Sequence, residues 1–199
     1  MMKIRIQANT VYTSMSAAVV KHLHKPTPEI KKFGGNPLEY RKFYRQLQAR
    51  IVANTDNEEE KITYLEQFTH GEASKVVSEF SHLIGEHSYS AAIKQLEERY
   101  GDTEVIAHAF IKRALEWPTI QAGDSKPLDD FSLFLIECEN AAESMEAMRI
   151  LEYSENIKRL MIKLPFYFHD RWRNEVMLTK EKKESVTFTH FVQFVIQEA

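Results

Sequence analysis

The sequence predicts an all-α protein of five helices, a hinge and four further helices. Through most of the 199 residues, apolar side chains recur at steps of three and four, the period of an amphipathic helix. The six glycines and six prolines are few and fall between the periodic segments. Alternating apolar runs joined by tight turns do not recur, so the pattern gives no indication of a sheet.

The clearest helix start lies in residues 33–43, which read FGGNPLEYRKF. The two glycines favour a turn, because glycine accepts positive φ without steric cost. Asn36 then offers a side-chain oxygen to free helix amides, and Pro37 suits the first helical position. The residues that follow on one apolar stripe are Tyr40, Phe43, Leu47 and Ile51.

The same signals place the other helices along the chain. Predicted caps are Asn57, Ser88 or Ser90, Asp102 or Thr103, Ser154 and Thr187. A helix also begins at Pro165 and ends before the charged run 180–184, which we expect to be a loop. The first helix covers 37–54, and the remaining ranges are 58–71, 72–83, 88–101, 103–118, 128–148, 154–164 and 187–199.

A linker is predicted at residues 119–127, where Gly123 and Pro127 stand in a stretch with few apolar residues. We therefore expect a basic flexible arm at 1–27, an N-terminal lobe at 28–118 and a C-terminal lobe at 128–199. This arrangement puts five helices in the first lobe and four in the second.

The charge is unevenly distributed. The chain carries a net charge of −3, yet residues 1–35 hold six basic residues and one acid. A basic arm on an acidic body can contact nucleic acid, and an ordinary solvated tail is the alternative. RNA is thus a candidate partner, whereas the lack of a long apolar run disfavours a membrane. The basic residues of the arm are Lys3, Arg5, Lys21, Lys25, Lys31 and Lys32.

Catalytic motifs are not evident. The sequence contains no phosphate-binding loop, nucleophile elbow or His-Glu-x-x-His metal helix. The only cysteine, Cys138, lies on an inward stripe, which predicts a buried inert thiol. We therefore expect a protein that is not an enzyme, with no cofactor, no metal and no small-molecule substrate.

Several short strings occur in an order that resembles the Gag-like capsid region of BEL/Pao-type LTR retrotransposons. The opening string 33–43 carries the resemblance, with Asn36 in place of the usual acid, which is an equal helix cap. The others are Lys61-Ile62 with Tyr64-Leu65, Gly71-Glu72-Ala73, Tyr89 with Ala92, Leu96 with Arg99-Tyr100-Gly101, Trp117-Pro118, Lys163-Leu164-Pro165 and Arg171 with Trp172.

The resemblance implies a two-lobed, retroviral capsid-like helical protein that acts as a structural Gag/capsid protein. Such proteins self-assemble into a shell, or virus-like particle, that packages RNA in the cytoplasm. Their N-terminal lobes form rings and their C-terminal lobes pair as dimers, so we expect a homo-oligomer. The alternative is a domesticated capsid-like module that binds a peptide or nucleic acid without forming a shell.

Candidate interface residues follow from this expectation. In the N-terminal lobe, outward residues of the first helices are expected to line a ring contact: Arg41, Arg45, Gln48 and Glu59. In the C-terminal lobe, the helix from Ser154 and the following turn are expected to form the dimer contact, through Ile157, Met161, Phe166, Tyr167 and Trp172. Phe166 and Tyr167 do not belong to the inward-facing apolar stripe, and exposed aromatic residues are typical of interfaces. The alternative is that both side chains cover the lobe's own core.

Overall fold

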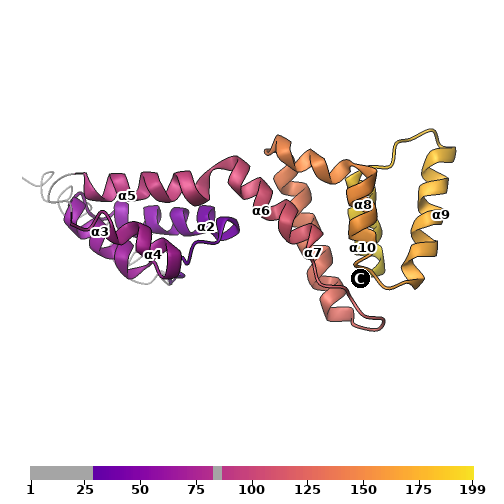
Figure 1. Cartoon of the computed structure of the whole chain (residues 1–199), viewed down its shortest axis with the longest axis horizontal. Helices are drawn as coiled ribbons and strands as arrows, with labels where there is room; N and C mark the ends of the chain where they lie inside the picture. The colour runs from indigo at the N-terminus through magenta and orange to yellow at the C-terminus, as the bar shows by residue number, and fades with distance from the viewer. Residues whose placement is uncertain (1–28, 83–86) are drawn as a thin grey trace, which may run out of the picture. The chain divides into compact units, whose positions relative to one another are not determined.

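The computed structural model describes residues 29–82 and 87–199, and nearly all regular structure in these ranges is helical (Figure 1). The described ranges contain no β-strand, only an isolated parallel bridge between Phe33 and Thr69. The all-α prediction is therefore confirmed. The α-helices are α2 (Pro37–Leu47), α3 (Glu58–Gln67), α4 (Gly71–Ser78), α5 (Ser88–Leu96), α6 (Thr103–Leu115), α7 (Ser125–Ala142), α8 (Ser154–Met161), α9 (Tyr167–Glu181) and α10 (Phe188–Glu198).

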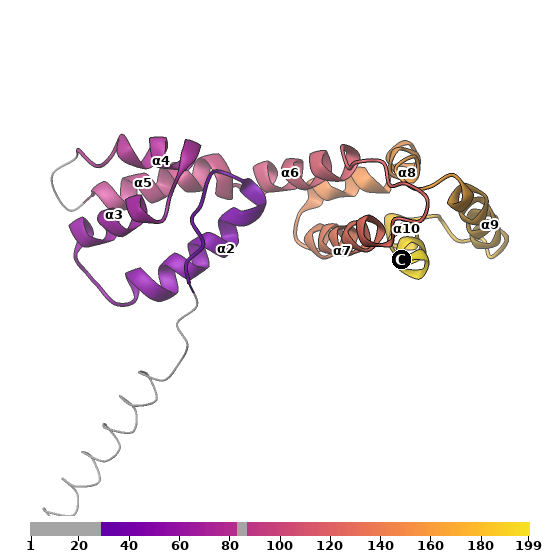
Figure 2. The ribbon, with the colours of Figure 1, turned by 90° about the horizontal axis from the view of Figure 1, so that it is seen from below.

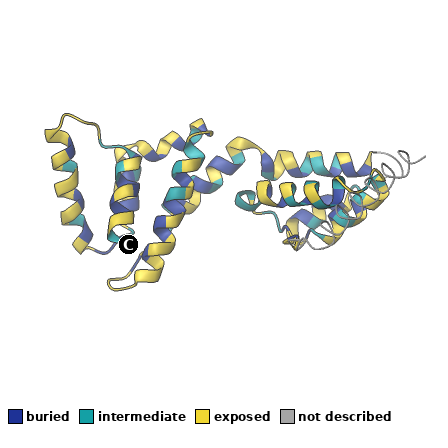
Figure 3. Ribbon diagram, turned by 180° about the vertical axis from the view of Figure 1, so that it is seen from behind, coloured by how far each residue is buried: buried dark blue, intermediate teal, exposed yellow. Residues whose placement is uncertain are grey.

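Three shorter helical segments continue or connect these helices. η1 (Gln48–Val52) and η2 (Glu97–Gly101) are π-helical and extend α2 and α5. η3 (Glu146–Glu152) is a 3₁₀-helix between α7 and α8. Each α-helix turns a buried face inward and an exposed face outward, as Figure 3 shows by colour.

Local side chains start the helices largely where the sequence predicts. The side chain of Asn36 accepts a hydrogen bond from the Leu38 amide (3.2 Å), and Asn57 accepts one from Glu59 (2.9 Å). Thr187 caps α10 through the amide of His190. The predicted serine caps of α5 and α8 are not formed, because His87 and Tyr153 occupy those cap positions without a side-chain bond.

The N-terminal helices pack around the aromatic ring of Phe33. Its backbone amide donates to the Phe68 carbonyl (2.9 Å), and its carbonyl accepts from the His70 amide (2.9 Å). Its ring stacks on Phe43 at 5.0 Å. The rings of Tyr40 and Tyr100 meet it edge-on. The segment before α2 is thereby held among the helices.

The adjacent glycines are required by this packing. Gly35 has φ +107°, a conformation that side chains with a Cβ rarely adopt. A Cβ on Gly34 would lie 2.6 Å from the His70 imidazole. The turn predicted from these two glycines therefore also lets the chain pass close to His70.

Helix α6 contributes its buried side chains to the core formed by α7–α10. Ile106, Phe110 and Ala114 belong to the same apolar cluster as residues of α7, η3, α8, α9 and α10. The Phe110 ring stacks on Phe134 of α7 at 6.0 Å. Helix α6 lies beside α7 and α8 (Figure 2). The predicted grouping of five helices and four is not confirmed, because helical periodicity marks a buried face without identifying the helix that covers it.

The predicted linker is partly helical and partly packed on the core. α7 begins at Ser125, with Pro127 tolerated in its first turn, and it ends at Ala142 rather than at 148. Ile120 is buried, and its amide donates to the Lys163 carbonyl at the end of α8 (2.8 Å). Residue Lys180, predicted to begin a loop, lies in the last turn of α9.

The buried thiol of Cys138 provides the first testable prediction. Burial raises the pKa of this thiol to about 12, the Glu137 carboxylate adds to the rise, and Arg113 opposes it. Since the thiolate is the reactive form, Ellman's reagent should label the native protein slowly and the urea-unfolded protein rapidly. Rapid labelling in native buffer would contradict the burial of this side chain.

The same shift predicts how stability depends on pH. The native thiol keeps its proton up to about pH 12, whereas the unfolded thiol loses it near its ordinary pKa of 9.0. The native state therefore binds the proton more tightly, and this contribution to stability is lost as pH rises between these values. The variant Cys138→Ala lacks this titrating group. Its free energy of unfolding, measured by urea titrations, should therefore fall less than that of the wild-type protein over that alkaline range.

Candidate assembly interfaces

Three large apolar side chains are exposed where α8 leads into α9, and we call Ile162, Phe166 and Tyr167 the α8–α9 corner. Their exposed fractions are 64%, 77% and 49%. The backbone between them is anchored, because Leu164 and Pro165 are buried. Large apolar groups held outward on a fixed backbone mark a candidate interaction surface.

The aromatic rings of the corner rest on neighbouring rings. Phe166 lies 5.5 Å from the His169 ring, and Tyr167 lies 4.3 Å from Phe168, whose own side chain is buried. These contacts support one side of each exposed ring and leave the other side free. The sequence left open whether Phe166 and Tyr167 cover the core; in the structure both are exposed, and their role in an interface stays a prediction.

The other predicted interface residues of this region lie inside the core. Ile157, Met161 and Trp172 are buried. The Trp172 ring packs against Phe191 (5.4 Å) and Phe194 (5.2 Å) of α10. These three side chains belong to the same apolar cluster as Leu164 and Phe168, so the prediction that they form an interface is not met. Ile162 was not among the predicted interface residues, although it follows α8 directly and lies off the apolar stripe formed by Ile157, Leu160 and Leu164.

The N-terminal candidates form a polar stripe. Arg41, Arg45 and Gln48 follow one another at steps of four and three, which places them on one side of α2 and the start of its continuation η1. Both arginines are exposed, and Arg41 donates a long hydrogen bond (3.4 Å) to the Thr103 hydroxyl. Within the described ranges neither arginine forms an ion pair with a carboxylate. Glu59 is exposed in the first turn of α3, on a different helix.

Most of the predicted nucleic-acid arm lies outside the described residues. Lys3, Arg5, Lys21 and Lys25 fall in residues 1–28, so the prediction for them stays a prediction. Lys31 and Lys32 are described and exposed.

The described residues also carry no group of three or more His, Cys, Asp or Glu side chains placed to hold a metal ion. Burial raises the pKa of Tyr40, with Glu97 adding to the rise, and burial also raises the pKa of Tyr89. Both phenols therefore keep their protons at neutral pH. Among the helices of the described part, none has the length and apolar character needed to cross a bilayer.

Comparison with known proteins yields one family. A family model described as a protein of unknown function (DUF1759) matches residues 33–180, beginning at the buried Phe33. This family is found in retrotransposon Gag/Pol polyproteins. The chain matches no curated protein and no solved structure. Since the family match extends over most of the sequence, the chain belongs to the DUF1759 family.

Proposed function

We propose that this protein is a structural Gag-type capsid protein that assembles with copies of itself into a shell that packages RNA. The observation that carries the proposal is the α8–α9 corner, where Phe166 is the most exposed large apolar side chain among the described residues. The occurrence of the family in retrotransposon Gag/Pol polyproteins supports it.

The corner suits a two-fold contact between copies. In an isologous dimer the same side chains meet from both subunits, so every buried group counts twice. Fully burying a phenylalanine side chain contributes about 1.5–3 kcal/mol. Phe166, flanked by Ile162 and Tyr167, therefore offers a concentrated apolar contribution to dimer formation.

The polar stripe of α2 suits a second, head-to-tail contact. Arg45, which makes no ion pair within the described ranges, could meet the exposed Glu59 of a neighbouring copy, and a heterologous contact of this kind closes into a ring when the rotation permits. RNA packaging through the basic arm would add a steep dependence on salt concentration.

The assembly proposal is tested by replacing Phe166. Wild-type protein should self-associate, and Phe166→Ser should raise the dimer dissociation constant about a hundredfold, since each of the two copies loses about 1.4 kcal/mol. Light scattering after size exclusion and negative-stain imaging, at several salt and protein concentrations, measure the effect.

A matched control distinguishes the corner from general surface hydrophobicity. Met177 is 56% exposed on α9, and Met177→Ser should leave the dissociation constant unchanged. Wild-type protein that stays monomeric at high concentration in every salt condition would overturn the proposal.

A further inference from the structure

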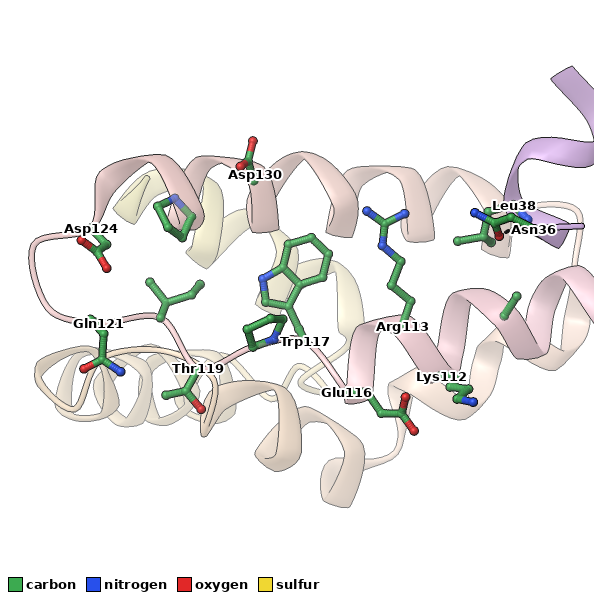
Figure 4. A pocket seen from close by; sticks show the side chains of 14 residues that line it. Asn36, Leu38, Lys112, Arg113, Glu116, Trp117, Thr119, Gln121, Asp124 and Asp130 are labelled. Atoms are coloured by element: carbon green, nitrogen blue, oxygen red, sulfur yellow. Dashed lines mark hydrogen bonds between the residues drawn. The ribbon is translucent and has the colours of Figure 1, made fainter. Parts of the chain in front are cut away.

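A second surface feature is a groove bounded by the carboxyl half of α6, the loop 118–124 and the first turns of α7, with Asn36 and Leu38 at the start of α2 at one end (Figure 4). Its volume is about 840 Å³, in the range of clefts that bind a small molecule or a group of that size. Its apolar floor comprises Trp117, Pro118, Ile120 and Pro127. None of these residues belongs to the α8–α9 corner.

The floor of the groove is backed by the core. The Trp117 indole packs against Phe131 (5.1 Å) and Phe134 (5.0 Å), both of which are buried. Ile120 is buried beside them in the same apolar cluster. An indole held in this way is preformed, so a ligand that stacks on its free side does not have to order it first.

One wall presents a cation that has no anionic partner. The Arg113 guanidinium lies 4.5 Å from the centroid of Phe134 and 5.5 Å from that of Trp117. Within the described ranges it makes no ion pair. Stacking uses the face of a guanidinium and leaves its N–H groups at the edge, where a carboxylate can accept two hydrogen bonds.

The groove is also lined by two aspartates, Asp124 and Asp130. Figure 4 shows Trp117 between Arg113 on one side and Asp124 on the other, with Asp130 projecting from α7. Asp124 and Asp130 are exposed and make no ion pair with a described cation. On the outer edge of α6, Lys112 and Glu116 carry opposite charges, so the polarity of the groove rests on Arg113 and the two aspartates.

We propose that this groove binds an extended peptide segment with an acidic residue, an apolar centre and a basic residue. The acid pairs with Arg113, the apolar centre packs on Trp117, and the carboxylates of Asp124 and Asp130 attract the base. Aromatic-lined grooves bind extended, proline-containing segments in this manner. The aspartates would repel the phosphates of a nucleic acid, which favours a peptide over RNA. The proposal goes beyond self-assembly and does not depend on it.

The test uses the full chain carrying Phe166→Ser, so that contacts through the corner do not interfere. The probes are fluorescein-labelled, end-capped peptides of the form Asp–(apolar)–Lys, with two to five central residues drawn from Leu and Pro. Anisotropy titrations should give micromolar dissociation constants for at least one length. Peptides with two acids, two bases or a serine centre should bind at least tenfold more weakly.

Variants of the groove distinguish the proposed contacts. Arg113→Ala should weaken binding at least tenfold, and Arg113→Lys should weaken it less, because the charge remains while the fork is lost. Asp130→Lys should instead shift the preference toward the peptide with two acids, a gain that general destabilisation cannot produce. Lys182→Ala, at the exposed end of α9, is the matched control and should have no effect.

Three outcomes would overturn the proposal. The first is that no peptide of the panel binds with a dissociation constant below about 1 mM, which corresponds to a binding free energy on the order of −4 kcal/mol. The second is equal binding to wild-type and Arg113→Ala protein. The third is evidence that the groove has another occupant. Such evidence would be displacement of the peptide by single-stranded RNA, or concentration-dependent self-association that the Arg113→Ala variant no longer shows. Peptide binding by a monomeric chain would leave the groove proposal intact even if the assembly proposal failed.

Discussion

A fragment of residues 119–199 is expected to show no cooperative thermal unfolding, whereas a fragment of residues 102–199 should retain it. The shorter fragment lacks α6, and with it the buried side chains of Ile106, Phe110 and Ala114. Losing a buried phenylalanine alone costs about 3–5 kcal/mol, while a whole domain is stable by about 5–15 kcal/mol. Loss of Trp117 would further uncover Phe131 and Phe134.

Circular dichroism and scanning calorimetry of the two fragments measure this difference. In the full chain, Phe110→Ala should lower the free energy of unfolding by about 3–5 kcal/mol. The control Phe166→Ala, at an exposed position, should change it by no more than about 0.5 kcal/mol. A sharp, reversible transition in the fragment 119–199 would show that α7–α10 form a core without α6.

Phe33→Ala is expected to destabilise the N-terminal helices by about 3–5 kcal/mol, the range for removing a buried phenylalanine. The ring of Phe33 is 1% exposed and contacts the rings of Tyr40, Phe43 and Tyr100. Its removal leaves a cavity that these rings, fixed on α2 and η2, can fill only in part. Alanine retains the backbone hydrogen bonds to Phe68 and His70, so the effect reports the side chain.

Urea unfolding monitored by circular dichroism measures this loss, and hydrogen exchange locates it. Exchange should accelerate in α2–α5, which surround the ring, and change less in α7–α10. Phe33→Leu keeps most of the apolar volume and should recover more than half of the lost stability. A change below about 1 kcal/mol for Phe33→Ala, typical of a surface position, would contradict the packing described for this ring.

The proposals for assembly and for the groove use side chains with different surroundings. Phe166 is exposed because its neighbours Leu164, Pro165 and Phe168 are buried and hold the backbone in place. Arg113 is available because the aromatic rings beneath it provide no opposite charge. The two sites can therefore be altered one at a time, and self-association and peptide binding can be measured separately.

Much of the helical structure could be predicted from the sequence, because its causes lie within a few residues. The side chains of Asn36, Asn57, Asp102 and Thr187 each accept a hydrogen bond from an amide two or three residues ahead. The apolar stripe from Tyr40 to Ile51 is buried as its spacing indicates. Cys138 is likewise buried on its predicted face.

Only the tertiary structure decided which helices share a core and which apolar residues are left outside. The sequence placed α6 with the preceding helices, because Pro118 and Gly123 follow it; in the structure α6 contacts α2 and also contributes to the apolar cluster that contains α7–α10. The sequence showed that Phe166 does not belong to the inward-facing apolar stripe, but not whether its side chain is exposed. It also gave no indication that Arg113, Trp117 and Asp130 line the same groove. Caps and periodicity act over one or two helical turns, whereas burial and charge pairing depend on residues distant in the chain.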